Sequence, residues 1–369
     1  MRSVRVSLQE RSYDIFVGRG ILQNLPGYFK KKKFTRRHAL IITQKEIAIH
    51  HESALRDALL QSGVEARVFL TPHAKSSEAA KSPAVYWKLI RSIAAYDGEG
   101  KSVFLIVLGG GVAGDLTGFA ASVYRRGIPY LQVPTTLTAQ VDSAIGGKTG
   151  IDLPEGKNLL GTIYQPALVI CDTALLSTLH ERHWSDGFAE VIKYGLVKDP
   201  GLFLILEKHG KNGIRHDAGL LEKVIHRSVA IKAKVVEKDE FDKKGVRVIL
   251  NFGHTVGHAI EAATRFSSRY THGEAIAVGM LVACEISREL GLLKDPELTE
   301  RLEKVLLKFD LPLFYKGCSL EALFKAIGYD KKSIQGKNRF VLPVSMGKVA
   351  VVPDVPSELI KKTLQKRSA

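Results

Sequence analysis

Hydrophobic and polar residues along the N-terminal part of the chain alternate with two different periods. Alternation at every second position predicts a strand hairpin over residues 3–17, and continuous apolar runs predict buried strands at 38–43 and 103–108. Stretches with helical spacing lie between the strands, at 45–62 and 82–96. Strands that alternate with helices predict a parallel sheet covered by helices on both faces.

The pattern changes at about residue 174, where long amphipathic helices begin. Helical spacing extends over 218–238, 273–290 and 296–308, and a closing hairpin is expected around 339–352. The sequence therefore predicts an α/β part followed by a helical part. A length of 369 residues is sufficient for two domains.

Composition limits the classes of function. The net charge of +16 suits a nucleic-acid surface, a site for anionic small molecules, or a solvated basic face. Basic residues do not interleave with aromatic ones, so we expect no nucleic-acid partner. The apolar stretch 103–114 is too short to cross a bilayer, and the N-terminus has no signal-peptide core, so we expect neither a membrane partner nor export. Three scattered cysteines suit a reducing cytoplasm.

Histidines mark a candidate metal site. His254 and His258 are four residues apart, so on a helix they share one face, and His272 follows closely. Three imidazoles in nineteen residues suit a metal ion, although pairs with this spacing also occur in purely structural helices.

A glycine run follows the most apolar strand. Residues 109–115, GGGVAGD, stand where a strand gives way to a helix, which suits close approach of backbone N–H groups to a phosphate or simply a tight turn. Thr135 and Thr136 follow the next strand, and lysines accompany the glycines of GGKTG (146–150) and GKN (156–158). Ligands of open α/β sheets bind at the carboxyl ends of strands, which favours the ligand interpretation.

Glu190 and Lys193 lie on one face of an expected helix. Such pairs are commonly exposed ion pairs, but the apolar neighbours in GFAEVIKYG (187–195) predict burial. Because a buried carboxylate needs a partner or a metal, Glu190 is a candidate third metal ligand.

Several blocks together resemble the 3-dehydroquinate synthase family of sugar phosphate cyclases. They are GGGVAGDLTGF (109–119), RRGIPYLQVPTTLTAQVDSAIGGKTGID (125–152), GKNLLG (156–161), GFAEVIKYG (187–195), KAKVV (232–236), GVRVILNFGHTVGHAIE (245–261) and HGEAIAVGM (272–280). The resemblance implies a dehydroquinate synthase-like fold: a Rossmann-like, NAD-binding α/β domain over 1–178, an all-α metal- and substrate-binding domain over 179–369, and an active site between them. It also implies a cytoplasmic homodimer that acts in the shikimate pathway.

The resemblance assigns a role to each matching residue. The ligands of Zn²⁺ or Co²⁺ would be Glu190, His254 and His272, with His258 turned to the substrate phosphate instead. NAD would be held by Glu78, Lys81, Gly111, Val112, Ala113, Gly114, Asp115, Thr135, Thr136, Asp142, Lys148, Lys157, Asn158, Leu175, Leu176, Ser177 and Thr178. Catalytic and substrate-binding groups would be Asp142, Lys148, Asn158, Lys193, Lys232, Arg247, Asn251, His258, Lys331 and Lys332, and Arg126 would reach the phosphate site of a neighbouring subunit.

The implied reaction converts 3-deoxy-D-arabino-heptulosonate 7-phosphate to 3-dehydroquinate and phosphate. It proceeds by transient oxidation with NAD, phosphate elimination, re-reduction, ring opening and aldol closure. The alternatives are another sugar phosphate cyclase or a metal-dependent polyol dehydrogenase of the same architecture. Such dehydrogenases lack the GGKTG and GKN lysine blocks, which this chain has.

Overall fold

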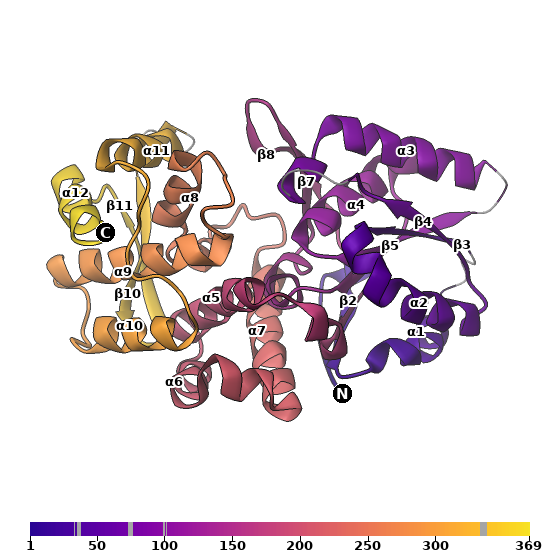
Figure 1. The fold of residues 1–369 in the computed structure, drawn as a ribbon, viewed down its shortest axis with the longest axis horizontal. Coiled ribbons are helices and arrows are strands. Elements are labelled where there is room, and N and C mark those ends of the chain that lie inside the picture. Colours follow the sequence, from indigo (N-terminus) through magenta and orange to yellow (C-terminus); the bar gives the residue numbers. More distant parts are fainter. Residues whose placement is uncertain (33, 35–37, 73–76, 99, 101, 333–337) are drawn as a thin grey trace. The chain divides into compact units, whose positions relative to one another are not determined.

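The computed structural model divides the chain into two compact units (Figure 1). The first comprises Met1–Leu179 and Lys232–Glu240, and the second His180–Ile231 and Phe241–Ala369. No helix in the described parts is both long and apolar enough to cross a membrane. The structure describes residues 1–32, 34, 38–72, 77–98, 100, 102–332 and 338–369.

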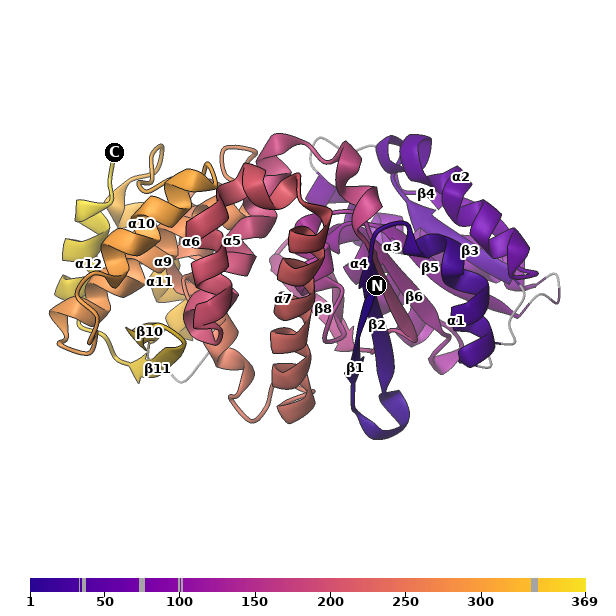
Figure 2. The same cartoon turned by 90° about the horizontal axis from the view of Figure 1, so that it is seen from below.

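The first unit is built around a seven-stranded sheet with the strand order β1-β2-β9-β6-β5-β3-β4. β1 pairs with β2 antiparallel, forming the predicted N-terminal hairpin, and all other neighbours in the sheet are parallel (Figure 2). The strands are β1 (Arg2–Val6), β2 (Tyr13–Gly18), β3 (His38–Thr43), β4 (Glu65–Leu70), β5 (Val103–Gly109), β6 (Tyr130–Pro134) and β9 (Leu168–Asp172).

Helices cover both faces of this sheet, as the alternating pattern predicts. Along β5, Phe104 and Ile106 belong to one hydrophobic core, whereas Leu105 and Val107 belong to the other. The first core includes α1 (Leu25–Lys31) and α2 (Lys45–Gln61), and the second includes α3 (Pro83–Asp97) and α4 (Gly111–Val123). Successive side chains of a strand point to opposite faces, so a central strand buried on both sides must be apolar throughout.

A separate two-stranded hairpin of β7 (Lys148–Leu153) and β8 (Gly156–Ile163) carries the two lysine blocks. The short helices of this unit are η1 (Gln9–Arg11), η2 (Ile21–Asn24), η3 (Ser77–Ala80), η4 (Tyr124–Arg126), η5 (Ala139–Ser143) and η6 (Thr173–Thr178).

Helix α9 (His272–Glu289) is the centre of the second unit (Figure 1). Its residues are buried on nearly all sides, as expected for a helix with apolar residues around its whole circumference. It packs against α5 (Glu181–Val197), α8 (His254–Ala263), α10 (Leu298–Lys308), α12 (Ser357–Lys366) and β10 (Arg339–Ser345).

The second unit is helical, as predicted, and it also holds the expected closing hairpin of β10 and β11 (Lys348–Pro353). Helix α7 (Ala218–Lys238) contributes residues to both units, because Lys232 and the residues after it group with the first. The remaining helices are α6 (Pro200–Arg215), η7 (Arg247–Asn251) and α11 (Leu320–Lys332).

Candidate active site

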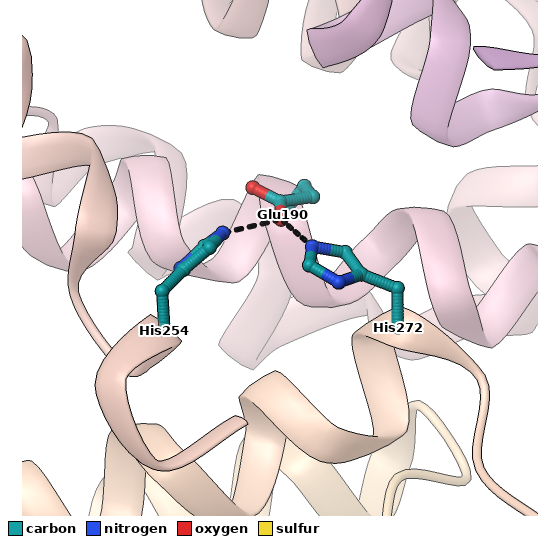
Figure 3. A group of neighbouring side chains, drawn as sticks. All are labelled: Glu190, His254 and His272. Atoms are coloured by element: carbon teal, nitrogen blue, oxygen red, sulfur yellow. Dashed lines mark ion pairs between the residues drawn. The ribbon is translucent and has the colours of Figure 1, made fainter. Parts of the chain in front are cut away.

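Glu190, His254 and His272 converge in the second unit (Figure 3). Glu190 lies on α5 and is 1% exposed, while the two histidines begin α8 and α9. Glu190 Oε1 is 3.5 Å from His254 Nε2 and 3.3 Å from His272 Nε2. The potential ligand atoms of all three lie within 4.8 Å of one another, so this group has the composition and spacing of a metal-binding set.

Two glycines bring these side chains together. Gly253, the N-cap of α8, has a φ of 80°, and a Cβ there would lie 2.9 Å from the Ile276 carbonyl oxygen of α9. A Cβ on Gly273 would lie 2.3 Å from the Asp186 carbonyl oxygen of α5. Glycine therefore permits both the left-handed turn before His254 and the close approach of α9 to α5 beside His272.

The loop before His272 is held by side chains from α5. Arg182 donates two parallel hydrogen bonds to the Glu274 carboxylate, at 2.8 and 2.7 Å, and two more to the carbonyls of Ser268 and Arg269. Asp186 accepts a hydrogen bond of 2.6 Å from the Gly273 N–H. Since Glu190 follows Asp186 by four residues, the helix that supplies one metal-ligand candidate also fixes the loop that supplies another.

A capping box begins α9 at the same place. Thr271 accepts a hydrogen bond from the Glu274 N–H, and the Glu274 carboxylate accepts one from the Thr271 N–H. This reciprocal pair satisfies backbone donors of the first turn and fixes the path of the chain as it enters α9 at His272.

The electrostatics of the cluster keep Glu190 ionised. Burial alone would raise the pKa of Glu190, but its ion pair with the Lys193 ammonium and its hydrogen bonds from the histidines hold that pKa well below its ordinary value. Burial, and then the Lys193 charge, lower the pKa of His254. Burial opposes the charged form of His272, but hydrogen bonds to Glu190 and Glu261 raise its pKa well above the ordinary value. Both Glu190 and Lys193 are buried, as their apolar neighbours predict.

His258 lies next to this set without belonging to it. Its ring centroid is 5.3 Å from that of His254 and 5.9 Å from that of His272, and it forms a second possible donor group with Glu261 and His272. Desolvation, followed by the two neighbouring imidazoles, lowers the pKa of His258, although its side chain is exposed to solvent. The two histidines that share a helix face thus fall into different donor groups.

Arg247 and Asn251 lie on the short helix η7, which leads into α8. Arg247 is 5% exposed, whereas Asn251 is exposed. Lys331 and Lys332 end α11, and their side chains lie outside the part of the chain that the structure describes.

The carboxyl ends of neighbouring strands form the candidate nucleotide site in the first unit. Gly109 ends β5 and pairs with Pro134 of β6, and the Thr135 N–H donates a hydrogen bond of 3.0 Å to the Gly109 carbonyl. The glycine turn, the Thr135–Thr136 pair and the Leu175–Thr178 segment thus follow three adjacent parallel strands, β5, β6 and β9. This is the edge where open α/β sheets bind ligands.

A hydroxyl group without a hydrogen-bond partner lies beside the tightly packed glycine turn. The Ser143 hydroxyl is buried without a hydrogen-bond partner, and it lies 2.9 Å from the position that a Cβ on Gly111 would take. A Cβ on Gly110 would lie 3.3 Å from Thr136. An unpaired hydroxyl next to the N-terminus of α4 suits a ligand with anionic oxygens.

Lys81 is the centre of a charged cluster near this edge. Its ammonium lies 2.9 Å from Asp115, 3.6 Å from Glu78 and 3.8 Å from Asp152, and it donates a hydrogen bond to Asn158. Lys157 pairs with Glu78 at 3.4 Å. Burial raises the pKa of Asp115 to about 6, although the Lys81 charge lowers it. The predicted residues Glu78, Lys81, Asp115, Lys157 and Asn158 are therefore neighbours in space.

Two further predicted residues pair within the first unit. The Lys232 ammonium lies 2.7 Å from both the carboxylate and the carbonyl oxygen of Asp142. Lys148 begins β7 and its side chain is exposed. Thr178, at the end of η6, contacts the buried His51 at 2.8 Å.

Arg126 lies on η4 with unusual backbone geometry. Arg125 and Arg126 have φ angles of 49° and 64°, and Gly127 follows. Non-glycine residues rarely adopt this conformation, and it concentrates where a side chain has a particular task.

Sequence reasoning missed the residues that hold the ligand candidates in place. These residues are Arg182, Asp186 and Glu274, whose hydrogen bonds hold the loop before His272. Glu261 lies beside His272, and Asp152 lies beside Lys81. The capping box Thr271–Glu274 was readable as a T-x-x-E motif, but the Arg182 bond joins residues 92 positions apart.

Comparisons with known proteins agree across both units. Residues 72–186 match the family described as 3-dehydroquinate synthase N-terminal, and residues 187–333 match 3-dehydroquinate synthase C-terminal. The 3-dehydroquinate synthase of Symbiobacterium thermophilum is 42% identical over 98% of this chain and 99% of its own length.

Solved structures extend the likeness to the fold. The 2-epi-5-epi-valiolone synthase of Streptomyces hygroscopicus subsp. jinggangensis, with NAD⁺ and Zn²⁺ bound, has a TM-score of 0.85 at 30% identity and covers 98% of each chain. A 2-deoxy-scyllo-inosose synthase complexed with carbaglucose-6-phosphate, NAD⁺ and Co²⁺ has a TM-score of 0.85 at 26% identity, over 99% of this chain and 100% of its own.

The fold is that of the sugar phosphate cyclases. Within that class, the chain belongs to the 3-dehydroquinate synthase family. The fold class and the family expected from the motif blocks are thus confirmed.

Proposed function

We propose that the protein is a phosphate-eliminating lyase that converts 3-deoxy-D-arabino-heptulosonate 7-phosphate to 3-dehydroquinate and phosphate. The observation that carries this proposal is the likeness over the whole chain to proteins named 3-dehydroquinate synthase, at 42% identity for the relative from Symbiobacterium thermophilum. The reaction places the protein in the shikimate pathway, which supplies aromatic amino acid biosynthesis.

NAD and Zn²⁺ or Co²⁺ are the proposed cofactors. Two features at the carboxyl edge of the sheet suit NAD. One is the unpaired Ser143 hydroxyl, and the other is the absence of a side chain at Gly111, where a Cβ would lie 2.9 Å from that hydroxyl. Glu190, His254 and His272 would hold the metal, since two imidazoles and one carboxylate suit zinc and leave a position for substrate. When bound, NAD takes up and returns a hydride, and the metal polarises the reacting oxygen.

The charged side chains suit a substrate that carries both a carboxylate and a phosphate. Arg247 would clamp the carboxylate with two hydrogen bonds, because its planar guanidinium matches that geometry. Hydrogen-bond donors to the other substrate oxygens would come from Lys148, Asn158, Lys193, Lys232, Asn251, His258 and the Lys331–Lys332 pair. Asp142 holds the Lys232 ammonium in position for this task. The substrate's own phosphate would accept the proton during elimination, so no protein base is required.

We also propose an oligomeric state, a role for each domain and a cellular location for the protein. Residues 1–178 form the NAD-binding domain and 179–369 the metal- and substrate-binding domain of a homodimer. The left-handed backbone at Arg126 supports a specialised role for this side chain, which would reach the phosphate site of the second subunit. A cytoplasmic location fits the free cysteines Cys171, Cys284 and Cys318.

One assay separates this function from the alternatives. Purified protein with NAD and Zn²⁺ or Co²⁺ is given the heptulosonate phosphate, and phosphate release and NADH are followed together. We expect phosphate release without net NADH, and its loss in Glu190→Ala. Steady NADH formation from glycerol or another polyol would indicate the dehydrogenase instead. Turnover of a sugar phosphate that lacks the carboxylate, with none of the heptulosonate phosphate, would indicate a different cyclase.

A further inference from the structure

The imidazole of His272 has a carboxylate at each of its nitrogens. Nε2 lies 3.3 Å from Glu190 Oε1, and Nδ1 lies 3.5 Å from Glu261 Oε2. Glu190 comes from α5, whereas Glu261 lies on the last turn of α8. The ring of His272 is therefore held between two acceptors from different helices.

His254 has the same arrangement with a different outer partner. Its Nε2 lies 3.5 Å from Glu190 Oε1, and its Nδ1 lies 3.1 Å from the Phe252 carbonyl oxygen. Both histidines thus direct Nε2 toward one oxygen of Glu190, as Figure 3 shows, and both have an acceptor behind Nδ1.

We propose that Glu261 is a positioning residue, which holds the Nδ1–H of His272 so that the Nε2 lone pair is free for a metal ion. A neutral imidazole carries one N–H, and an acceptor at Nδ1 fixes the proton there. A carboxylate in this place also aligns the ring and makes it a better ligand. The inference rests on the metal centre proposed above.

The backbone around Glu261 is suited to holding its side chain still. Its carbonyl accepts hydrogen bonds from the Phe266 N–H at 2.7 Å and from the Thr264 hydroxyl at 3.2 Å. Arg265 and Phe266 have positive φ angles of 55° and 51°, which end the helix sharply. The Glu261 side chain is only 15% exposed, so little solvent competes with His272 for the carboxylate.

A competing role for Glu261 is that of a direct ligand. The donor atoms of His258, Glu261 and His272 also lie within 4.8 Å of one another. A cation there would use Nδ1 of His272, so a single imidazole would serve two metal ions. The positioning role predicts one ion per chain, and the ligand role predicts two.

The test compares Glu261→Met with Glu261→Gln. Methionine keeps the length and helix propensity of the side chain but removes the acceptor, whereas glutamine keeps a neutral acceptor. Zn²⁺ affinity is measured by competition with a chromophoric chelator, and the Co²⁺-loaded protein by its visible absorption. We expect Glu261→Met to bind Zn²⁺ about 10- to 100-fold more weakly and to change the Co²⁺ spectrum. Glu261→Gln should lie between Glu261→Met and the unmodified protein.

Controls separate positioning from general destabilisation. Glu358→Met changes an exposed glutamate of α12 and should leave Zn²⁺ affinity within about twofold, because sites without shared partners act nearly independently. The thermal midpoint of metal-free protein should be alike in all three variants.

Three results would overturn the proposal. One is a Zn²⁺ affinity of Glu261→Met within twofold of the unmodified protein, with an unchanged Co²⁺ spectrum. Another is a second bound ion that disappears in Glu261→Met. The third is equal weakening in both Glu261 variants, together with a lowered metal-free midpoint. If Glu190→Ala also binds Zn²⁺ normally, the metal centre itself is wrong, which distinguishes that failure from a failure of Glu261 alone.

Discussion

Arg182 and Glu274 join α5 to the first turn of α9 through two parallel hydrogen bonds of 2.8 and 2.7 Å. The same guanidinium holds the carbonyls of Ser268 and Arg269, so one side chain fixes the loop and the helix start on either side of His272. Preorganisation of this proposed metal ligand therefore depends on a residue eight positions before Glu190, on the same helix.

Replacing Arg182 with lysine should weaken the metal centre. Lysine keeps the charge but cannot form the forked contact, so the loop before His272 loosens. We expect Zn²⁺ affinity about tenfold weaker. Because the Arg182 side chain is 39% exposed, we expect only about 1–2 kcal/mol of lost stability.

The matched control for Arg182 is Arg301→Lys. Arg301 forms the same two-bond contact with Glu207, at 2.9 Å for each bond, between α10 and α6. This variant should lose similar stability and keep its Zn²⁺ affinity. Equal Zn²⁺ affinities in the two variants would contradict the assigned role of Arg182.

Replacing Gly253 with alanine should disrupt the start of α8. A positive φ of 80° costs alanine about 1–2 kcal/mol, and the added Cβ would lie 2.9 Å from the Ile276 carbonyl. We expect more than about 2 kcal/mol of lost stability together with impaired metal binding. Chemical denaturation and Zn²⁺ titration measure the two effects.

Gly328→Ala is the corresponding control in α11. A Cβ at Gly328 meets no atom within 4 Å. Alanine is the better helix former, so we expect a gain of about 0.5–1 kcal/mol or no change. If the Gly253 variant were as stable as this control, the tight crossing of α8 and α9 would be incorrect.

Replacing Arg247 with alanine should reduce turnover of the heptulosonate phosphate. A buried bidentate contact to a carboxylate is worth about 3 kcal/mol, which corresponds to a loss of roughly 100-fold in kcat/KM. Steady-state phosphate release measures the loss, and Arg301→Ala serves as the control for folding. A value of kcat/KM within twofold of the unmodified protein would show that Arg247 does not clamp the substrate.

Asp115 should make stability depend on pH between about 4 and 6. Burial raises its pKa from 3.8 to about 6 in the folded protein, so the folded state favours the protonated carboxyl. Its contribution to the free energy of unfolding is fully present below pH 3.8 and is lost as the pH rises through 6. The difference between pKa values of 3.8 and about 6 corresponds to a loss of at most about 3 kcal/mol, and the 25% exposure of the Asp115 side chain reduces it.

Denaturation of NAD-free protein at several pH values tests this dependence. Asp115→Asn cannot ionise, so its stability relative to the unmodified protein should increase between pH 4 and 7. Asp57→Asn, at an exposed position of α2, should show no such trend. The opposite slope for Asp115→Asn would mean that attraction to Lys81 outweighs burial.

Local periodicity was enough to predict much of the fold. The apolar run in β5 predicted a strand buried on both faces, because each face of the sheet meets its own core. The hairpin of β7 and β8 was missed, because its strands contain Gly150 and Gly161, which lack the side chains that mark a strand. A Cβ on Gly161 would lie 2.1 Å from the Thr149 carbonyl, so the glycine reflects close pairing of the two strands.

The candidate site could be predicted only in part. Residue spacing shows which side chains share a helix face, but not which residues of other helices they contact. His254 and His258 share such a face, yet the carboxylate that His254 Nε2 contacts belongs to Glu190, 64 residues earlier in the sequence. Residue patterns marked Glu190 and His272 as candidates, and the family motifs separated His258 from the ligand set, whereas the orienting contacts of Arg182 and Glu261 required coordinates. Long-range hydrogen bonds leave no periodic trace in a sequence.

Residues 232–240 belong to the first unit, so this unit can complete its contacts only late in translation. Ser7 hydrogen-bonds to Glu237 and Arg11 to Glu240, over separations of 230 and 229 residues. A ribosome makes about 5–20 residues per second, so the N-terminal hairpin waits on the order of 10–50 seconds for these partners. Ser7 and Arg11 must therefore remain without these partners until α5, α6 and α7 have been made, although the last strand of the sheet, β9, is made much earlier.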